Sequence, residues 1–168
     1  FSGAELIKFN MKDGATGNIY NVYDPILGTY TRKITRTSTS TDIKQECKYS
    51  NSGSTITLKK DGKIWVQGGN SYGQLGDGTT FPISASKNIG TDYISLTCIG
   101  LSNIYRNPSV LAIKSDGTLW GWGANDGGIL GDGTVSKVLA PKLIDSGYSS
   151  IKTNDSIIIG LKSDGSLW

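Results

Sequence analysis

The sequence contains no histidine among its 168 residues. Histidine is the commonest general base in enzymes and the commonest metal ligand, so its absence narrows the catalytic and metal sites that the chain can build. The formal net charge is only +3, and no run of lysine or arginine exceeds two residues. Such weak, scattered charge predicts no nucleic-acid partner. No stretch approaches the roughly 18 apolar residues of a membrane span, so no membrane partner is predicted either.

Cysteine is also scarce, with Cys47 and Cys98 as the only two. Two thiols without histidine do not compose a zinc site, and we expect no metal and no cofactor. Each cysteine follows the isoleucine of a strand-like run, Ile43 or Ile94, by four residues, so the two can occupy equivalent places in neighbouring units. We expect two separate, small buried side chains. A disulfide is the alternative, and the sequence leaves the redox compartment open.

Glycine, in contrast, is abundant, with 23 residues and about twice its usual share. The excess has no collagen-like period, so it indicates many tight turns. The segments "SVLAIK" (109–114) and "TLWGWG" (118–123) alternate in strand fashion on either side of Ser-Asp-Gly. Asp-Gly between two such runs is a strong hairpin signal because glycine accepts a positive φ. No convincing amphipathic helix accompanies these short strands, so the sequence predicts an all-β protein.

The chain repeats itself, beginning with the pentapeptide LGDGT at 75–79 and again at 130–134. Residues 58–80 align with residues 113–135 at an offset of 55 and without a gap, and residues 161–168 are a third copy at an offset of 48. A repeat of this length is the signature of a solenoid or propeller. We assign structural roles in the repeat to Asp61, Gly62, Trp65, Gly76, Asp77, Gly78, Asp116, Gly117, Trp120, Gly131, Asp132, Gly133, Asp164, Gly165 and Trp168.

This pattern resembles the repeats of the regulator of chromosome condensation family, whose core runs through DG-x-hydrophobic-W-x-W-G-x-N and GQLG-x-G. The resemblance covers about 43–168, including "DGTLWGWGAND" and "GQLGDGT". It implies a β-propeller in which each copy supplies one four-stranded blade, commonly seven to a ring.

The predicted fold class is therefore all-β, a partial β-propeller of two four-stranded blades plus the start of a third. This domain spans 43–168, and a small β-rich adaptor at 1–42 precedes it, with Thr37–Thr41 as a linker. Two blades and the first part of a third cannot close a ring or bury the apolar face of every blade. We expect further copies after Trp168 in a longer polypeptide; the alternative is that several chains complete one ring.

LGDGT can be a ligand site or a scaffold. A P-loop needs Gly-Lys-Ser/Thr opening a helix, and an EF-hand needs alternating aspartates before a glutamate; neither is present. The glycines instead permit left-handed backbone and close approach between blades, while Asp77 and Asp132 cap local amides. We expect Trp65, Trp120 and Trp168 to lie in the core between blades.

Variation between copies marks the surface that is free to specialise. Each copy has an isoleucine in its first strand and an aspartate in its hairpin turn. More residues separate these two in the copies that begin at Ile43 and Ile94 than in the copy that begins at Ile151. The extra residues fall in 48–55 and 99–110, which a propeller places on one face. Solvent loops without a partner are the alternative to a binding surface. The predicted binding residues are Tyr49, Asn51, Tyr105, Arg106 and Asn107.

These features favour a non-catalytic recognition module, since no nucleophile–base pair, metal cluster or paired carboxylates are visible. We expect a protein or cell-surface glycan partner, or other subunits of a larger assembly. Threonine- and tyrosine-rich β segments before a β domain favour a bacteriophage tail, a tail-like particle or a secreted bacterial surface protein, so the expected location is extracellular or virion-associated. A chromatin-associated guanine-nucleotide exchange factor and an enzyme inhibitor, both of which the family includes, are the alternatives.

Overall fold

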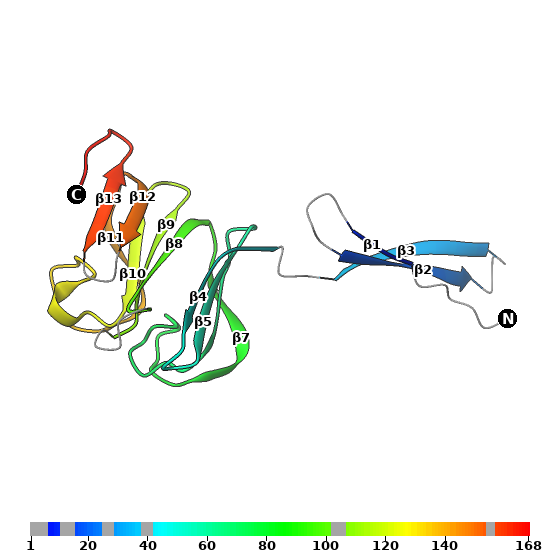
Figure 1. Cartoon of the computed structure of the whole chain (residues 1–168), viewed down its shortest axis with the longest axis horizontal. Coiled ribbons are helices and arrows are strands. Elements are labelled where there is room, and N and C mark those ends of the chain that lie inside the picture. Colours follow the sequence, from blue (N-terminus) through cyan, green and yellow to red (C-terminus); the bar gives the residue numbers. More distant parts are fainter. Residues whose placement is uncertain (1–6, 11–15, 25–28, 38–41, 102–106, 154–156) are drawn as a thin grey trace. The chain divides into compact units, whose positions relative to one another are not determined.

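The computed structural model of the chain describes residues 7–10, 16–24, 29–37, 42–101, 107–153 and 157–168. The chain divides into two compact units, Phe1–Ile43 and Lys44–Trp168 (Figure 1). Strands and turns make up nearly all of the described residues, which also include a three-residue 3-10 helix at Asp126–Gly128. Within these ranges no helix is long and apolar enough to cross a bilayer.

The first unit is a three-stranded antiparallel sheet. Its strands are β1 (Ile7–Asn10), β2 (Thr16–Asp24) and β3 (Thr29–Thr37), in the order β1-β2-β3. The long β2–β3 hairpin keeps one register, with Thr16 opposite Thr37 and Asp24 opposite Thr29. β3 lies entirely within the threonine-rich segment of residues 29–39. Residues 25–28 and most of the predicted linker, 38–41, lie outside the described residues.

The second unit contains two four-stranded antiparallel sheets and a two-stranded one, each with its strands in chain order (Figure 1). The first strands of successive sheets are neighbours, since β12 contacts β8, and the Leu96 amide of β8 donates to Gln45 Oε1 of β4 at 2.7 Å. This arrangement confirms the predicted partial propeller of two blades and the start of a third. The strands are β4 (Ile43–Tyr49), β5 (Ser54–Lys59), β6 (Ile64–Gly68), β7 (Ile83–Gly90), β8 (Tyr93–Ile99), β9 (Ser109–Lys114), β10 (Leu119–Gly123), β11 (Val138–Asp145), β12 (Tyr148–Thr153) and β13 (Ile158–Lys162).

The strand register corrects one equivalence drawn from the sequence. Leu96 pairs with Ala112 in the second blade, and Ile151 pairs with Gly160 at the equivalent place in the third. Leu96, which is buried, is therefore the counterpart of Ile151, whereas Ile94 is 41% exposed. The segment from Leu96 to the hairpin residue Asp116 in the second copy is therefore seven residues longer than the segment from Ile151 to Asp164 in the third. The predicted insertion thus remains, although it is shorter than the isoleucine alignment implies.

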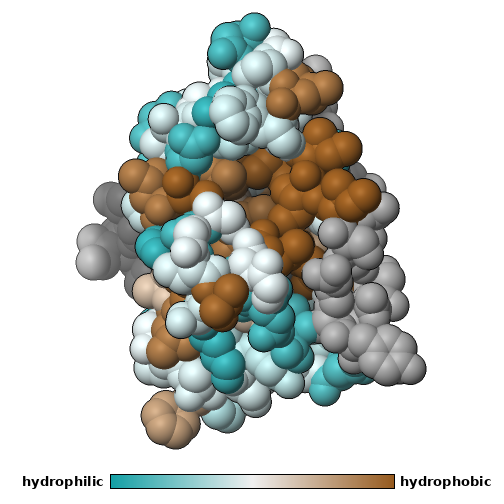
Figure 2. Space-filling view, turned by 90° about the vertical axis from the view of Figure 1, so that its left-hand side faces the viewer, coloured by the Kyte–Doolittle hydropathy of each residue, from teal (hydrophilic) through white to brown (hydrophobic). Residues whose placement is uncertain are grey.

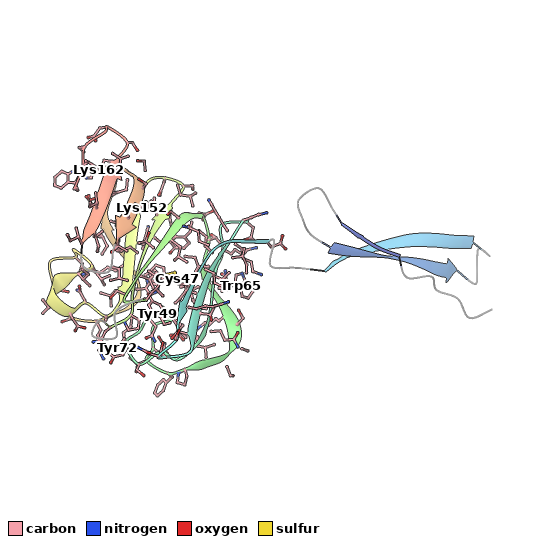
Figure 3. The ribbon with its side chains drawn as sticks, viewed as in Figure 1. Cys47, Tyr49, Trp65, Tyr72, Lys152 and Lys162 are labelled. Carbon is pink, nitrogen blue, oxygen red and sulfur yellow. A yellow bond between two sulfur atoms is a disulfide. The ribbon has the colours of Figure 1, made fainter. Side chains whose placement is uncertain are left out.

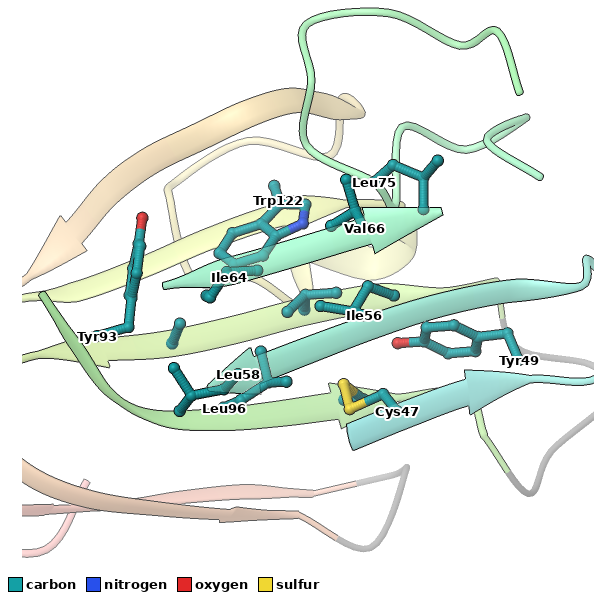
Figure 4. Close-up of a cluster of buried hydrophobic side chains, with 13 residues drawn as sticks. Cys47, Tyr49, Ile56, Leu58, Ile64, Val66, Leu75, Tyr93, Leu96 and Trp122 are labelled. Atoms are coloured by element: carbon teal, nitrogen blue, oxygen red, sulfur yellow. A yellow bond between two sulfur atoms is a disulfide. The ribbon is translucent and has the colours of Figure 1, made fainter. Parts of the chain in front are cut away.

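The main core lies between the first and second sheets (Figure 4). Alternate residues of β5 and β6 are fully buried, as the period of a half-buried strand requires. Residues with at most 1% of their surface exposed that join the two sheets in this core are Ile56, Leu58, Ile64, Val66, Val110 and Trp122.

The tryptophan that fills this interface is Trp122. Of the three tryptophans predicted to lie in the core between blades, Trp120 packs against the edge of this core, whereas the prediction is wrong for Trp65 and Trp168. Trp65 and Trp120 are only half-buried, and Trp168 is 69% exposed. The Trp122 indole donates to the Gln74 carbonyl oxygen at 3.0 Å. The first copy has Gln67 at the place of Trp122, so Trp122 is not among the residues that the copies share.

A glycine of the repeat makes room for this indole. Gly76 has φ +66°, and a Cβ atom there would lie 2.8 Å from two atoms of the Trp122 ring system. Any other residue would have to displace the ring and adopt a left-handed backbone. The close approach between blades predicted for the glycines of LGDGT is therefore present at Gly76.

A disulfide joins Cys47 of β4 to Cys98 of β8, with 6.2 Å between the two Cα atoms. Both residues are buried within the main core. The favoured expectation of two separate thiols is wrong, and the disulfide that was the alternative is present. The two side chains come from facing sides of the first strands of successive blades, so they meet in the interface. Sequence spacing shows neither that adjacency nor which way the side chains point.

The far side of the second sheet, which faces β12 and β13, carries a second apolar surface (Figure 2). A hollow of about 360 Å³ lies there, and Leu130 and Gly131 line it together with Ile144, Ile158 and Trp168. Leu130 and Gly131 correspond in the repeat to Leu75 and Gly76. The hollow therefore occupies the place that Trp122 fills in the first interface.

Reduction of the disulfide is expected to destabilise the second unit. The bond closes a loop of 51 residues, and the chain-entropy relation gives about 4 kcal/mol for a loop of this length, with about 2 kcal/mol as the lower expectation. Urea denaturation with and without a reductant, followed by tryptophan fluorescence, measures the loss in the free energy of unfolding. The Cys47→Ala/Cys98→Ala variant should have about the stability of the reduced protein, and adding the reductant should not change it. Identical curves for oxidised and reduced protein would contradict a stabilising bond.

Candidate functional site

The Asp-Gly turns have one geometry in all three copies. In each turn the aspartate Oδ1 accepts a hydrogen bond from the amide two residues ahead, which closes the turn locally. The donors are the amides of Lys63 at 3.1 Å to Asp61, Thr118 at 3.0 Å to Asp116 and Ser166 at 2.9 Å to Asp164. Gly62, Gly117 and Gly165 follow with φ of +79°, +80° and +88°. These carboxylates are engaged in shaping the turns.

The same turns tie one blade to the next. The Gly62 carbonyl oxygen accepts from the Tyr93 amide at 3.0 Å, and the Gly117 carbonyl oxygen accepts from the Tyr148 amide at 2.9 Å. Tyr93 and Tyr148 open the first strands of the following sheets. Burial raises the pKa of the Tyr93 hydroxyl to about 12, so this side chain stays neutral in the core.

The repeated tryptophans lie beside these turns, each under a lysine ammonium. The distance from Nζ to the ring centroid is 5.0 Å for Lys59 and Trp65, 4.7 Å for Lys114 and Trp120, and 4.8 Å for Lys162 and Trp168. Such cation–π pairs stabilise exposed positions by about 0.5–1 kcal/mol. The three tryptophans therefore buttress the hairpins, which accounts for their recurrence better than a place in the core does.

One of the three indoles lacks a hydrogen bond. Trp120 Nε1 donates to the Thr118 hydroxyl at 2.8 Å, and Trp168 Nε1 donates to the Ser166 hydroxyl at 3.1 Å. In the first copy Lys63 replaces the hydroxyl residue, and Trp65 Nε1 is buried without a partner among the described residues. An unsatisfied buried donor costs free energy, so the first hairpin is less favourable than the other two.

The LGDGT segments are self-contained loops held by an asparagine and an aspartate. Asp77 Oδ1 accepts from the Thr79 amide at 3.1 Å, the Thr79 hydroxyl at 2.9 Å and the Asn70 side-chain amide at 2.9 Å. Asn70, which is only 1% exposed, accepts in turn from the Leu75 amide at 2.9 Å. In the second copy, Asp132, Thr134, Asn125 and Leu130 form the same four bonds.

A lysine completes each of these loops. Lys142 Nζ lies 2.7 Å from Asp132 Oδ2, and Lys87 Nζ lies 3.5 Å from Asp77 Oδ2. The hydrogen bond from Lys142 and those from Thr134 hold the pKa of the Asp132 carboxyl well below its ordinary value of 3.8, against the effect of desolvation. For Asp77, burial raises the pKa but the hydrogen bonds from Thr79 outweigh it, so the pKa is again lowered. Hydrogen-bond donors of the chain itself engage the carboxylates of Asp77 and Asp132, so we assign these loops a structural role.

The two long connections predicted to form a surface meet around one cavity of about 570 Å³, which we call the loop cavity. Its walls come from three connections, β4–β5 and β6–β7 of the first blade and β8–β9 of the second. The lining residues are Tyr49, Ser50, Asn51 and Ser52, then Gly69, Ser71 and Tyr72, then Gly100, Leu101, Asn107 and Pro108. None of these side chains carries a charge.

Of the five predicted binding residues, the structure brings three to the loop cavity. Asn51 is exposed on its rim, and Asn107 donates through Nδ2 to Asp126 Oδ2 at 2.7 Å. Tyr49 differs from the expectation of an exposed contact, because its side chain belongs to the buried cluster of Figure 4 and is only 3% exposed. Its hydroxyl donates to the Ser109 carbonyl oxygen at 2.7 Å. It links the two blades beneath the cavity. Tyr105 and Arg106 lie outside the described residues.

Sequence reasoning missed the residue that organises the cavity floor, Gln74. Its side chain is fully buried, and Nε2 donates to the Ser54 hydroxyl and the Gly69 carbonyl oxygen, both at 3.0 Å. Its Oε1 accepts from the Tyr72 amide at 3.0 Å. A signal was available, because this glutamine is part of the GQLG segment that carries the resemblance, whereas the second copy has Ile129 there. A glutamine at a place that an isoleucine can occupy indicates a local hydrogen-bond network.

Comparison with known proteins agrees with this geometry. A family model described as the regulator of chromosome condensation (RCC1) repeat matches residues 116–155. The match begins at the Asp-Gly turn of the second copy, Asp116 and Gly117, and ends just beyond β12. It therefore runs across the interface between the second and third blades.

Similarity to individual proteins covers more of the chain. Over 95 residues, 54% of the chain, it is 32% identical to the E3 ubiquitin-protein ligase HERC2 of Mus musculus, of which it covers 2%. The crystal structure of human WBSCR16 superposes with a TM-score of 0.54 at 18% identity over 90% of this chain. Yeast RCC1 (Prp20), solved with Kap60 bound, superposes with a TM-score of 0.53 at 14% identity over 96% of this chain. The chain covers 41% of each of these two structures, which share its fold.

Replacing Lys63 with threonine is expected to stabilise the first hairpin by about 1 kcal/mol, because a hydroxyl would then accept from the buried Trp65 indole. The ion pair lost with Lys63, whose side chain is 45% exposed, contributes little. The free energy of unfolding from urea denaturation measures the gain. Lys60→Thr, at an exposed position of the same turn three residues earlier, is the control and should bring no gain. A Lys63→Thr protein less stable than the parent would show that the indole does not need the acceptor.

Acid is expected to destabilise the second unit through its turn and loop aspartates. The pKa values of Asp77, Asp116 and Asp132 are lowered by folding, so their stabilising effect is complete above the ordinary value of 3.8 and declines as pH falls below it. The thermal midpoint should therefore hold steady from neutral pH down to about pH 5 and then fall. Asp132→Asn should lower the midpoint at neutral pH and flatten the acid decline. Parallel curves for the two proteins would contradict the role of Asp132.

Proposed function

We propose that the chain is a non-catalytic recognition module that binds its partner through the loop cavity. The observation that carries the proposal is the convergence of three connections from two blades on one uncharged cavity. Connections on a rigid β scaffold are a common place for binding residues. The cavity also contains both connections in which the copies of the repeat differ in length.

The chemistry of the lining supports binding. The groups that face the cavity are hydroxyls, carboxamides and one half-buried tyrosine ring, Tyr72, which are the adaptable contacts used by recognition surfaces. The aspartates that recur in the repeat, such as Asp77 and Asp132, are held by the chain's own donors elsewhere. The described residues contain no group of three or more carboxylate or thiol side chains arranged to hold a metal ion.

The compartment of action that we propose is extracellular or virion-associated. The Cys47–Cys98 disulfide supports this location, because disulfides persist outside the reducing cytosol and nucleus. A three-stranded sheet placed before the propeller suits attachment to other subunits of a bacteriophage tail, a tail-like particle or a secreted bacterial surface protein. The partner would then be a protein or a glycan of a cell surface.

The alternative of a chromatin-associated exchange factor receives less support. Yeast RCC1, which was solved with Kap60 bound, shares the fold at 14% identity, and the fold alone does not transfer a partner. A buried disulfide is unusual in the nucleus. The ligase HERC2 is matched over 2% of its length, which carries no argument for catalysis. An enzyme inhibitor would be a special case of the recognition module.

Binding to intact cells tests the proposal. The fluorescently labelled chain is incubated with a panel of bacterial cells, and cell-associated fluorescence is measured by flow cytometry. Asn51→Ala combined with Leu101→Ala, two exposed residues of the loop cavity, should reduce binding by about tenfold or more, as loss of an anchor does. Lys60→Ala combined with Lys152→Ala, exposed residues that do not line the cavity, is the control and should bind as the parent does.

Two results would overturn the proposal. The first is equal loss or equal retention of binding by the two double variants, which would place recognition elsewhere. The second is binding to DNA that weakens steeply between low and moderate salt, which would favour the chromatin alternative.

A further inference from the structure

We propose that the loop cavity binds a neutral saccharide, with the ring of Tyr72 beneath the sugar and the side chains of Ser50, Asn51 and Ser71 bonding its hydroxyl groups. The inference rests on the proposed function and names the ligand class of the same site. The cavity, at about 570 Å³, falls within the range of sites that enclose small ligands and is large enough for one or two pyranose rings.

Hydrogen bonds within the chain hold the cavity wall that the β4–β5 and β6–β7 connections form. The Ser52 and Ser54 hydroxyls share a hydrogen bond, and the Ser54 hydroxyl also contacts the Gly69 carbonyl oxygen at 2.7 Å. Gln74 bridges these groups from below, as described above. A wall already held by its own hydrogen bonds loses little conformational freedom on binding, which favours affinity for a small ligand.

The Tyr72 ring, which forms an aromatic part of the lining, is held in place by Lys137. Lys137 Nζ lies 5.2 Å from the centroid of the Tyr72 ring and donates to the Ser71 carbonyl oxygen at 3.3 Å. One lysine thus holds both the ring and the adjacent backbone. Figure 3 shows Tyr72 at the same end of the second unit as Tyr49. The face of an aromatic ring is electron-rich, and the C–H groups on one side of a pyranose are its natural complement.

The polar side chains on the rim remain available. Ser50, Asn51 and Ser71 are exposed, and their side chains form no hydrogen bond to the described part of the chain. Hydroxyls and carboxamides each both donate and accept. Neighbouring hydroxyl groups of a sugar do the same, so the two sets match without any net charge.

The described part of the lining favours an uncharged ligand. A phosphate, a sialic acid or a sulfated glycan would need a cationic partner, and none of the described residues that line the cavity is basic. The ammonium of Lys137, which is not part of the lining, is already engaged with the Tyr72 ring and the Ser71 carbonyl oxygen. A largely apolar ligand would need more than Leu101 and Pro108 as apolar contacts. The lining is therefore balanced for a ligand that is neutral, polar and has one apolar face.

Titration with defined sugars tests the inference. The probes are the methyl glycosides of glucose, galactose, mannose and N-acetylglucosamine, with N-acetylneuraminic acid as a charged probe and an uncharged Gly-Ser peptide as a peptide probe. Saturation-transfer NMR detects contact with the whole chain, and calorimetry gives affinity. We expect saturable binding of at least one neutral glycoside and none of the charged probe.

Matched variants locate the binding. Tyr72→Ala and Asn51→Ala should each weaken it by about tenfold or more, whereas Tyr72→Phe should retain it because the ring face is kept. Phe81→Ala removes an aromatic ring that is 74% exposed and does not line the cavity, so it is the control and should bind normally. Unchanged thermal midpoints show that each variant is folded.

The saccharide assignment falls if no neutral glycoside binds, if the Gly-Ser peptide binds in their place, or if Tyr72→Ala binds as tightly as the parent. Failure of the glycoside titrations does not by itself contradict the proposed function as a recognition module. If cell binding still depends on Asn51 and Leu101 while every glycoside fails, the recognition module stands with a different ligand. If cell binding is also indifferent to those residues, both proposals fall.

Discussion

The packing of one sheet face against the next is the constraint on which the rest of the second unit depends. Trp122 fills the gap between the first two blades, and it does so because Gly76 has no side chain and the Gln74 carbonyl oxygen accepts its indole N–H. Both groups belong to the LGDGT loop and its approach, which the buried Asn70 holds through hydrogen bonds to Asp77 and Leu75. The polar loop thus shapes one wall of an apolar interface.

The same loop couples the interface to the candidate site. Gln74 contributes its carbonyl oxygen to Trp122 on one side and its side chain to Ser54 and Gly69 on the other. Tyr49 adds a second link, because its hydroxyl crosses from the first blade to the Ser109 carbonyl oxygen of the second. The loop cavity is therefore a product of blade docking, and the hydrogen bonds of Gln74 and Tyr49 connect it to the interface between the blades.

Comparison of the copies separates scaffold from specialisation. Where the copies agree, as at Asp61 and Asp116, the side chain closes a turn. Where they differ, the difference has a local physical consequence. Lys63 in place of a hydroxyl residue leaves the Trp65 indole unpaired, and Gln74 in place of isoleucine builds the cavity floor.

The sequence by itself determined the repeat, the Asp-Gly hairpins, the all-β class and the place of the long connections, because these depend on local backbone preferences and on comparison along the chain. Only the tertiary structure decided that Trp122 is the core tryptophan, that Cys47 meets Cys98, that Tyr49 is buried and that Leu96 matches Ile151. Each of these depends on which side of a strand faces the neighbouring blade. A one-residue change of register reverses that side, and residue types alone do not fix it.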